Sequence, residues 1–378
     1  MRAFILKILY INAVCGVGST GRIVTDLMKE AKQQGHTVKV ACSTVEPIRN
    51  ADPEDVIIVG SKIDYYVHNA LSRLTDHEGL YSKAATKKLI RQIREYDPDL
   101  IHLHNLHGHW INYELLFKYL AAEDKKVIWT LHDCWAFTGH CSYFSLLECG
   151  KWKTKCVDCP GLSEYPKCYT KGDVERNYLR KKQAFTSIKK MSVITPSKWL
   201  AGLVKQSYLG KYDVEVINNK IDRNIFKPTP SDFREKYGLE NKTIVLGVSN
   251  VWSEHKGYYD FLRLAEILDD RFAVVLVGLT EKQIAELPSR IIGIKRTNDE
   301  KELAAIYTAS DYYVNASKSE TFGMTTLEAA ECGKKPIVYK GTAGEEIVAQ
   351  YGGTSVEQGA DAIKAAICSN ILGGVKLD

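Results

Sequence analysis

Short apolar runs alternate with amphipathic stretches along most of the chain. The runs have the length of strands, whereas the amphipathic stretches repeat their apolar residues every three or four positions, as helices do. In the first half the predicted strands are Phe4–Asn12, Thr37–Cys42, Val56–Val59, Leu100–His104, Lys126–Leu131, Ser192–Thr195 and Val214–Ile217. In the second half they are Thr243–Ser249, Phe272–Val277, Ile291–Ile294, Tyr312–Asn315 and Lys335–Val338. This alternation predicts an α/β fold with parallel sheets covered on both faces, and 378 residues suffice for about two domains.

The composition is that of a soluble globular protein, with 45% hydrophobic and 26% charged residues. The sequence contains no run of 18 apolar residues, so no transmembrane helix is predicted. The apolar start contains Lys7 and leads into a glycine-rich turn, which is typical of a first strand rather than of a signal peptide. We therefore expect a cytoplasmic protein. The net charge of +5 is too small to indicate nucleic-acid binding. Basic clusters at 87–94, 179–183 and 188–191 are ordinarily solvated, with peripheral contact with an anionic membrane as the alternative.

The stretch 312–338 carries the most informative chemistry. A polar loop follows its first strand, and a helix is predicted to begin near Phe322 on small and hydroxyl residues. The free N–H groups at such a helix start form an anion site. Glu320 and Glu328 have seven residues between them, which in a continuous helix would separate them by about 12 Å. That is too far for a paired acid and base, but it suits two carboxylates that hold different hydroxyls of one long ligand. Ordinary solvated glutamates are the alternative.

The context of these glutamates, S-x-x-E-x-F-G followed by A-A-x-C-G-x-x-P, resembles the signature of glycosyltransferase family 4. The resemblance implies a retaining enzyme of the GT-B fold, with two Rossmann-like domains facing across a cleft, similar to bacterial surface-polysaccharide glycosyltransferases. Such an enzyme moves a sugar from a UDP or GDP sugar to a glycan or lipid-linked acceptor, without a catalytic metal. The implied donor contacts around the helix start are Glu320 for the sugar, Glu328 for the ribose, and Phe322, Gly323, Met324 and Thr325.

The segment Asn218–Pro228 resembles the interdomain hinge of that family. We therefore expect an acceptor-side domain at residues 1–209 and a nucleotide-sugar-binding domain at 210–378. In the second of these, Arg296 follows a strand at the place where family members contact the base.

The loop Asn250–Gly257 resembles the family's G-R-x-x-x-x-K-G loop, whose Arg and Lys neutralise the donor diphosphate. Lys256 matches the Lys, while Asn250 stands at the Gly position and Val251 at the Arg position. Either Lys256 and the helix dipole carry more of the charge, or another cation compensates. The candidates for compensation are Arg223, His255 and Lys318. A surface lysine at a helix start is the alternative for Lys256.

The motif G-x-G-x-x-G at Gly16–Gly21 lies between a strand and a helical stretch, as in dinucleotide-binding proteins. A nicotinamide site also needs a carboxylate about 20 residues further on, but the second strand ends in Cys42-Ser43-Thr44. The family resemblance instead implies that Gly18, Ser19 and Gly21 face the donor phosphate and the acceptor. A nicotinamide-dependent oxidoreductase, a non-catalytic sugar-nucleotide binder and a purely structural turn remain alternatives.

Two polar segments follow strands of the first domain. The loop His104–Trp110 is rich in histidine, which by composition permits metal binding; the resemblance favours acceptor contact for His107 and Trp110. His132, in T-x-H-D, resembles the active-site histidine of the family and would steady the sugar or the incoming hydroxyl, with a buried edge residue as the alternative. The predicted catalytic residues are therefore His132, Lys256 and Glu320.

Six of the ten cysteines fall in an irregular insertion at residues 134–168. Four of them, Cys141, Cys149, Cys156 and Cys159, fit a tetrahedral structural zinc site. In a reducing compartment disulfides are not expected. An iron–sulfur cluster, another metal or free thiols are the alternatives.

Overall fold

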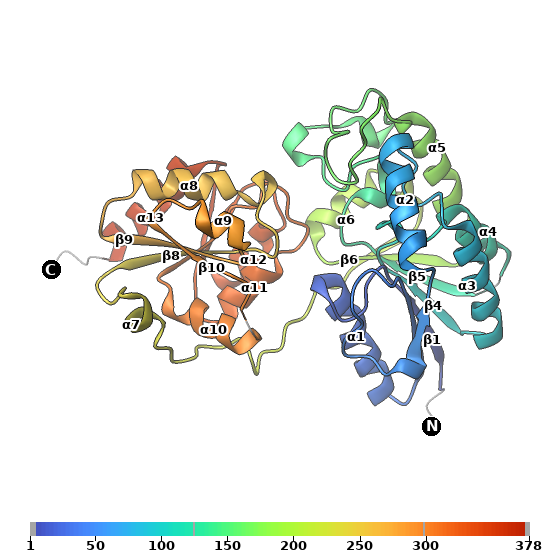
Figure 1. Ribbon diagram of the computed structural model, residues 1–378, viewed down its shortest axis with the longest axis horizontal. Coiled ribbons are helices and arrows are strands. Elements are labelled where there is room, and N and C mark those ends of the chain that lie inside the picture. The colour runs from blue at the N-terminus through green and yellow to red at the C-terminus, as the bar shows by residue number, and fades with distance from the viewer. Residues whose placement is uncertain (1–4, 124, 298, 375–378) are drawn as a thin grey trace. The chain divides into compact units, whose positions relative to one another are not determined.

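The computed structural model describes residues 5–123, 125–297 and 299–374, which form two compact units, Met1–Asn218 and Asn219–Asp378 (Figure 1). Both are α/β, as predicted. In the part of the chain that the structure describes, no helix is long and apolar enough to cross a membrane.

The first unit contains a seven-stranded parallel sheet in the order β3-β2-β1-β4-β5-β6-β7, which is doubly wound outward from β1. The strands are β1 (Lys7–Ile11), β2 (Thr37–Cys42), β3 (Val56–Ile58), β4 (Leu100–Leu103), β5 (Lys126–Thr130), β6 (Met191–Thr195) and β7 (Asp213–Val216). The helices are α1 (Gly18–Gln33), α2 (Lys62–Thr75), α3 (Lys83–Tyr96), α4 (Tyr113–Ala122), α5 (Val174–Phe185) and α6 (Lys198–Lys205), with 3₁₀ turns η1 (Pro53–Asp55) and η5 (Tyr208–Lys211).

The second unit repeats this plan with a six-stranded parallel sheet in the order β10-β9-β8-β11-β12-β13. The strands are β8 (Thr243–Val248), β9 (Phe272–Val277), β10 (Ile291–Ile294), β11 (Tyr312–Asn315), β12 (Pro336–Tyr339) and β13 (Thr354–Val356). The helices are η6 (Glu254–Lys256), α7 (Phe233–Tyr237), α8 (Tyr258–Ile267), α9 (Glu281–Ala285), α10 (Glu300–Ala309), α11 (Met324–Glu331), α12 (Gly344–Tyr351) and α13 (Ala360–Gly374).

Both sheets are buried on both faces. On β1, Leu9 and Ile11 join one apolar cluster while Ile8 and Tyr10 join another, because successive side chains of a strand point to opposite faces. The core of the second unit divides in the same way. The continuous apolar runs seen in the sequence are the consequence of this double coverage.

The expected domain boundary lies too early. Residues 213–216 form β7, which pairs with β6 in the first sheet, so a boundary after 209 would remove an edge strand from its own sheet. The compact units instead divide after Asn218.

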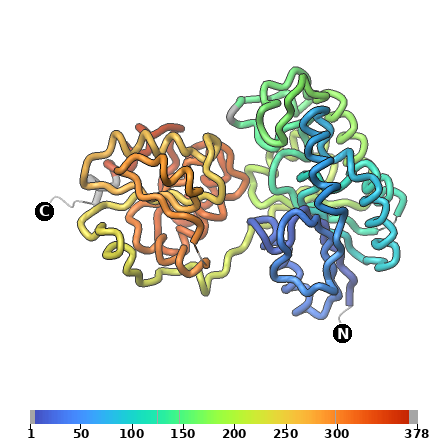
Figure 2. The backbone as a smooth tube through the Cα atoms, viewed as in Figure 1, coloured from blue at the N-terminus to red at the C-terminus, as the bar shows by residue number. Residues whose placement is uncertain are grey.

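The cysteine-rich insertion is a loop-rich excursion of the first unit that contains only short 3₁₀ turns, η2 (Trp135–Phe137), η3 (Ser145–Leu147) and η4 (Lys151–Lys153) (Figure 2). Aromatic side chains pack it onto the main core. Phe144 stacks on Trp152 at 4.9 Å between ring centroids, and Phe137 lies 5.3 Å from the same Trp152 ring. The insertion therefore has more apolar support than its few aliphatic residues suggested.

Candidate active site

The centre of the candidate donor site is an ion pair between Lys256 and Glu320. Lys256 Nζ lies 3.1 Å from Glu320 Oε2 and also donates to Ser317 Oγ at 3.2 Å. Lys256 ends η6, and Glu320 lies in the loop between β11 and α11. Two predicted residues that are 64 positions apart are thus in direct contact.

The surroundings keep Glu320 charged. Burial raises the pKa of the Glu320 carboxyl. The Lys256 ammonium, His255 and a hydrogen bond with Asn315 lower this pKa by more than burial raises it, so it ends below its ordinary value. Glu320 is therefore an anion at neutral pH. It can accept hydrogen bonds from hydroxyl groups but has no proton to give.

The two loops that carry this pair approach so closely that one of them requires glycine. Gly257 has φ +73°, and a Cβ atom there would lie 2.4 Å from both the Cβ and the carbonyl oxygen of Ala316. A hydrogen bond from the Lys318 N–H to the His255 carbonyl at 3.0 Å joins the same loops. The close approach accounts for the adjacent Lys256 and Gly257 in the sequence. Lys256 reaches Glu320 because Gly257 allows its loop to lie against Ala316.

Helix α11 begins beside Glu320, at Met324 rather than near Phe322. Gly323 has φ +94° and occupies the N-cap position, so the helix cannot begin earlier. Within the described residues no side chain caps this end, and its first turn contains no acidic residue. Met324 and Thr325 begin the helix, so their backbone N–H groups have no acceptor within the helix and can bind an anion at this end. The Phe322 side chain is buried in the core, so only its backbone can serve a donor.

Glu328 is only 3% exposed, and its Oε2 accepts a hydrogen bond from the Tyr307 hydroxyl at 3.0 Å. It is not a solvated helix residue. Tyr307 fixes the position of the carboxylate, and a ribose hydroxyl would have to be received at the small exposed part of this side chain.

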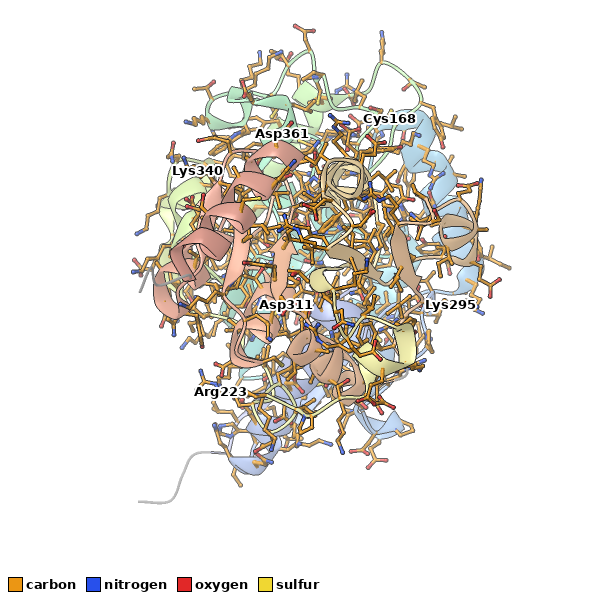
Figure 3. All side chains as sticks on the ribbon, turned by 90° about the vertical axis from the view of Figure 1, so that its left-hand side faces the viewer. Cys168, Arg223, Lys295, Asp311, Lys340 and Asp361 are labelled. Atoms are coloured by element: carbon orange, nitrogen blue, oxygen red, sulfur yellow. The ribbon has the colours of Figure 1, made fainter. Side chains whose placement is uncertain are left out.

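The structure shows the surroundings of the three cations that could compensate for the arginine replaced by Val251. Val251 is 73% exposed, so an apolar side chain occupies the surface where the family places the cation. Arg223, which is labelled in Figure 3, forms an ion pair with Glu331. Its Nη2 lies 2.9 Å from Glu331 Oε1, and Lys318 Nζ lies 3.7 Å from Glu254 Oε1.

The third substitute, His255, is also unsuitable. Burial and the neighbouring Lys256 lower its pKa to about 4, so it is neutral at pH 7. Of the predicted cations, Lys256 is the one that contacts Glu320 directly, beside the start of α11. Two further predicted residues, Asn250 and Arg296, are exposed and lie in the loops after β8 and β10.

In the first unit, the glycine-rich loop runs directly into α1. The helix begins at Gly18, four residues earlier than its apolar pattern indicated, so Gly18 and Ser19 form its first turn. Gly16 packs on the Arg49 backbone, where a Cβ atom would lie 2.0 Å from the carbonyl oxygen, and Gly21 accepts the Gly16 N–H through its own carbonyl. The motif thus supplies both a tight turn and an exposed helix start.

His132 lies at the carboxyl end of β5 in a stack of histidines. Its Nε2 is 3.0 Å from His104 Nδ1, and the two rings are nearly parallel, with an interplanar angle of 13°. His102 stacks on His104 in turn and bonds Thr130 Oγ1 at 2.8 Å. Burial lowers the pKa of His132 to about 4, so the ring is neutral at physiological pH. A neutral imidazole can donate and accept one hydrogen bond each, and His104 takes one of the two.

His107 and Trp110 differ from the expectation that both contact an acceptor. His107 Nε2 bonds Asp133 Oδ2 at 2.7 Å and its Nδ1 bonds the Tyr165 hydroxyl at 3.0 Å, so both ring nitrogens are engaged within the protein. Trp110 is 2% exposed and belongs to the main core. Its assignment to the acceptor is wrong, because too little of its surface is available to a ligand.

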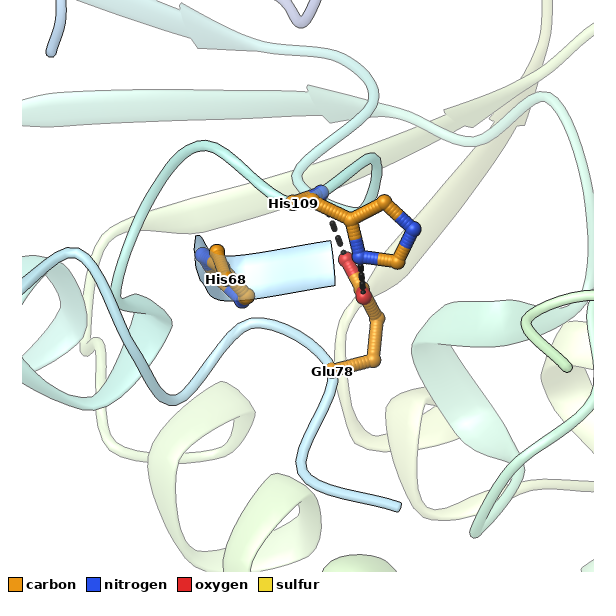
Figure 4. Close-up of side chains that lie close together, drawn as sticks. All are labelled: His68, Glu78 and His109. Atoms are coloured by element: carbon orange, nitrogen blue, oxygen red, sulfur yellow. Dashed lines mark hydrogen bonds and ion pairs between the residues drawn. The ribbon is translucent and has the colours of Figure 1, made fainter. Parts of the chain in front are cut away.

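Metal binding was the alternative function for the histidine-rich loop. One histidine of this loop belongs to a cluster of potential metal ligands that could not be recognised from the sequence. Figure 4 shows His68, Glu78 and His109, whose potential ligand atoms lie within 4.8 Å of one another. Each is already bound. Glu78 pairs with His109 Nδ1 and accepts the backbone N–H groups of Gly108 and His109 at 2.8 Å, while His68 Nε2 accepts the Gly79 N–H at 3.1 Å. The cluster holds the loop after β4 against α2 rather than offering vacant ligands.

The four predicted cysteines line one small pocket in the insertion, together with His140 and Trp152. The Gly139 N–H donates to Cys156 Sγ at 3.2 Å, the kind of bond that supports a thiolate. In the described part of the chain, however, the only three potential ligands within 4.8 Å of one another are those of the His68 cluster. The four sulfurs therefore share a pocket in which Cys141 and Cys159 are hydrogen-bonded, but no three of them lie together as closely as the roughly 3.8 Å of a tetrahedral site with 2.3 Å zinc–sulfur bonds.

Two doubly wound units, with a Lys–Glu pair at a helix start in the second, define a glycosyltransferase of the GT-B fold. The family model described as "Glycosyltransferase Family 4" matches residues 20–224. The family model described as "Glycosyl transferases group 1" matches residues 231–373. The chain therefore belongs to glycosyltransferase family 4, and it is a nucleotide-sugar-dependent enzyme. The comparisons give no support to the oxidoreductase alternative for the Gly16–Gly21 loop.

Individual relatives agree with this assignment. The colanic acid biosynthesis glycosyl transferase WcaC of Escherichia coli (strain K12) is 25% identical over 369 residues, with 93% of this chain and 88% of that protein covered. Sucrose-phosphate synthase from Thermosynechococcus elongatus has a similar structure, with a TM-score of 0.68, 16% identity, and 98% and 90% of the two chains covered. Anabaena HepE in complex with UDP and glucose gives a TM-score of 0.64 at 17% identity, with 97% and 90% covered.

Proposed function

We propose that the chain is a retaining glycosyltransferase of polysaccharide biosynthesis, which moves a sugar from a UDP or GDP sugar to a glycan or lipid-linked acceptor. The observation that carries the proposal is the Lys256–Glu320 pair at the start of α11. The assignment of WcaC, by its name, to colanic acid biosynthesis supports the pathway, and the complex of HepE with UDP and glucose supports the donor class.

The second unit would hold the donor through three groups. The Lys256 ammonium and the N–H groups of α11 would stabilise the negative charge that develops on the departing diphosphate, without a divalent cation. Glu320, kept anionic by its surroundings, would accept hydrogen bonds from the sugar hydroxyls. Glu328, fixed by Tyr307, would receive the ribose.

The first unit would serve the acceptor and the transferred sugar. The neutral ring of His132 would hold the sugar or the incoming hydroxyl, with its orientation set by His104. The α1 start at Gly18 and Ser19 would offer backbone N–H groups to phosphate. The His107–Asp133 pair would shape the acceptor side without touching the acceptor through its engaged ring nitrogens.

A thermal-shift screen of UDP, GDP and their sugars tests the donor assignment. A ligand at one hundred times its dissociation constant should stabilise the protein by about 2.7 kcal/mol. The Lys256→Ala variant should lose most of this ligand-dependent shift. The Lys340→Ala variant is the matched control, because it removes another Lys–Glu pair of the same unit, to Glu357 at 2.8 Å. Equal shifts in both variants would contradict the role of Lys256.

We further propose that Cys141, Cys149, Cys156 and Cys159 hold one structural zinc ion. Four thiols around a single pocket, and the N–H donor to Cys156, support this assignment. Binding would draw the sulfurs together and stiffen a segment that otherwise has only 3₁₀ turns and aromatic contacts. The zinc would act on folding, not on chemistry.

Elemental analysis of protein purified without added metal should find about one zinc per chain. Cys159→Ser should lose it and lower the melting temperature, with the nucleotide affinity of the second unit little changed. Cys332→Ser, at a buried cysteine of the second unit, is the control that should keep the zinc. Absence of metal with all four thiols reactive under native conditions would defeat the assignment.

A further inference from the structure

Helix α2 exposes its apolar side chains and buries its polar ones, the reverse of an ordinary surface helix. The buried residues are His68 and Ser72. The outward residues, with their exposed fractions, are Ile63 (76%), Tyr66 (63%), Val67 (52%), Leu71 (37%) and Leu74 (57%). At 100° per residue these five span an arc of about 140°, so they form one continuous apolar face. We call this set the α2 face.

The inner side of the helix explains how this orientation is maintained. His68 Nδ1 bonds Ser82 Oγ at 2.8 Å while its Nε2 accepts the Gly79 N–H, so a buried polar side chain is fully engaged. At the N-terminus, Ser61 and Asp64 form a capping box. Turning the helix to bury the α2 face would break the two bonds of His68, while the capping box stabilises the helix itself. The bonds of His68 therefore hold the apolar face outward.

A neighbouring part of the insertion extends the patch. The Tyr169 N–H donates to the Arg73 carbonyl at 2.8 Å, and Thr170 Oγ1 donates to the Leu74 carbonyl at 3.1 Å, so this segment lies along the end of α2 (Figure 1). Tyr169 is 59% exposed, and Lys167 Nζ lies 5.5 Å from its ring centroid. The extended patch adds an aromatic ring and a cation to the aliphatic face.

The charges around the patch favour an anionic partner. The basic residues on or beside α2 and in the adjoining segment are Lys62, Arg73, Lys167 and Lys171. The acidic residues in these segments are Asp64, whose carboxylate forms the capping box, and Glu164, so basic residues outnumber acidic ones by four to two. In an isologous dimer the same patch would face itself and bring like charges together. A lipid surface with anionic headgroups instead complements both the apolar residues and the lysines.

We propose that the α2 face docks on an anionic membrane surface. The proposal deepens the proposed function, since a lipid-linked acceptor lies at such a surface. The inner side of the same helix contacts the candidate acceptor loop: the rings of Tyr65 and His68 each lie 5.8 Å from the His109 ring. Docking through α2 would therefore place the loop after β4 next to the headgroup region.

Vesicle co-sedimentation of the full chain tests this surface. Wild-type protein should bind vesicles of phosphatidylcholine with phosphatidylglycerol, bind pure phosphatidylcholine more weakly, and lose binding as salt is raised. The double variant Ile63→Asp, Val67→Asp should partition at least about tenfold less, because it charges the apolar face. Tyr259→Asp, at a residue 63% exposed on the second unit, is the matched control and should bind as wild type does.

Two readouts separate the possible failures. Nucleotide binding without vesicles should be unchanged in the double variant, which shows that it folds and that the donor site is independent of docking. If the double variant binds vesicles as wild type does, the α2 face is not the membrane contact. If wild-type protein ignores vesicles but forms a dimer that the double variant lacks, the face binds a second copy and the lipid proposal is overturned.

Discussion

At the scale of single residues, Lys256 and Glu320 concentrate opposite charges at a helix start. Each charge serves a different part of the proposed donor: the ammonium serves the diphosphate and the carboxylate serves the sugar. The contact with Lys256 helps to keep the pKa of the Glu320 carboxyl below its ordinary value, so Glu320 is ionised at neutral pH. Substitutions of the two residues should therefore affect binding and turnover differently.

Glu320→Gln should leave nucleotide diphosphate affinity close to wild type while turnover falls roughly tenfold or more, since the lost charge acts mainly in the transition state. Titration calorimetry with the nucleotide and initial-rate kinetics with the donor measure the two effects. Unchanged turnover would remove Glu320 from the site.

Glu328→Ala should weaken nucleotide binding by about 1–3 kcal/mol, the scale of a lost hydrogen bond to a charged group. Tyr307→Phe is the companion variant, because it keeps the carboxylate and removes the hydroxyl that orients it, so a smaller loss is expected. If Glu328→Ala binds nucleotide as tightly as wild type, the ribose assignment fails.

At the scale of elements, the close approach of the loops before α8 and α11 positions Lys256. Gly257→Ala should destabilise the second unit and weaken nucleotide binding, because the new Cβ would clash with Ala316 in addition to the roughly 1–2 kcal/mol of left-handed backbone strain. Gly238→Ala is the matched control: its φ is +64°, but no atom lies within 4 Å of a Cβ atom there.

Melting temperatures and nucleotide titrations of the two variants give the comparison. Both should lose stability through strain, and only Gly257→Ala should also lose nucleotide affinity. Equal nucleotide binding by both would show that the loop approach does not position the lysine.

The bounds of several strands were predicted correctly from the sequence. The strands β2, β9, β10 and β11 have the predicted bounds, because a strand buried on both faces is a continuous apolar run. Helix starts were less accurate. α1 begins earlier than its apolar repeat, since Gly18 and Ser19 carry no apolar signal, and α11 begins later because Gly323 adopts a left-handed conformation.

Residues of the candidate site could be predicted where a sequence motif marks them, and less well where burial determines whether a side chain can reach a ligand. The K-G and E-x₇-E motifs identified Lys256 and Glu320, which the structure brings together. Trp110 was misassigned because a polar, histidine-rich loop gives no sign that its tryptophan enters the core. The inverted α2 could have been suspected from its polar residues at His68 and Ser72, four positions apart on one face.

At the scale of the whole molecule, buried neutral histidines should make stability depend on pH. Burial lowers the pKa of His68 and His132 to about 4 and that of His102 to about 3, while the unfolded chain titrates near 6.5. Below pH 6.5 the unfolded chain therefore binds protons that the folded protein excludes, and the free energy of unfolding should fall down to about pH 4. His107 contributes to the pH dependence of stability with the opposite sign, because the effect of Asp133 outweighs that of burial and raises the pKa of His107.

Chemical unfolding at pH 7.5, 6.5 and 5.5 measures this dependence. A clear loss of stability between pH 6.5 and 5.5 is expected, and the loss should be smaller in His102→Asn, which removes one of these groups. A free energy of unfolding that stays constant over this range would contradict the account of the histidine stack.

We propose that this chain is a retaining glycosyltransferase whose donor is a nucleotide sugar. Proton NMR of the intact chain, incubated with a panel of UDP and GDP sugars and a glycan acceptor, measures both the turnover and the stereochemistry that this proposal requires. One donor should release nucleotide diphosphate, and a new anomeric signal should appear with the configuration of that donor. Binding of a donor without any release of nucleotide diphosphate, or a product of inverted configuration, would contradict it.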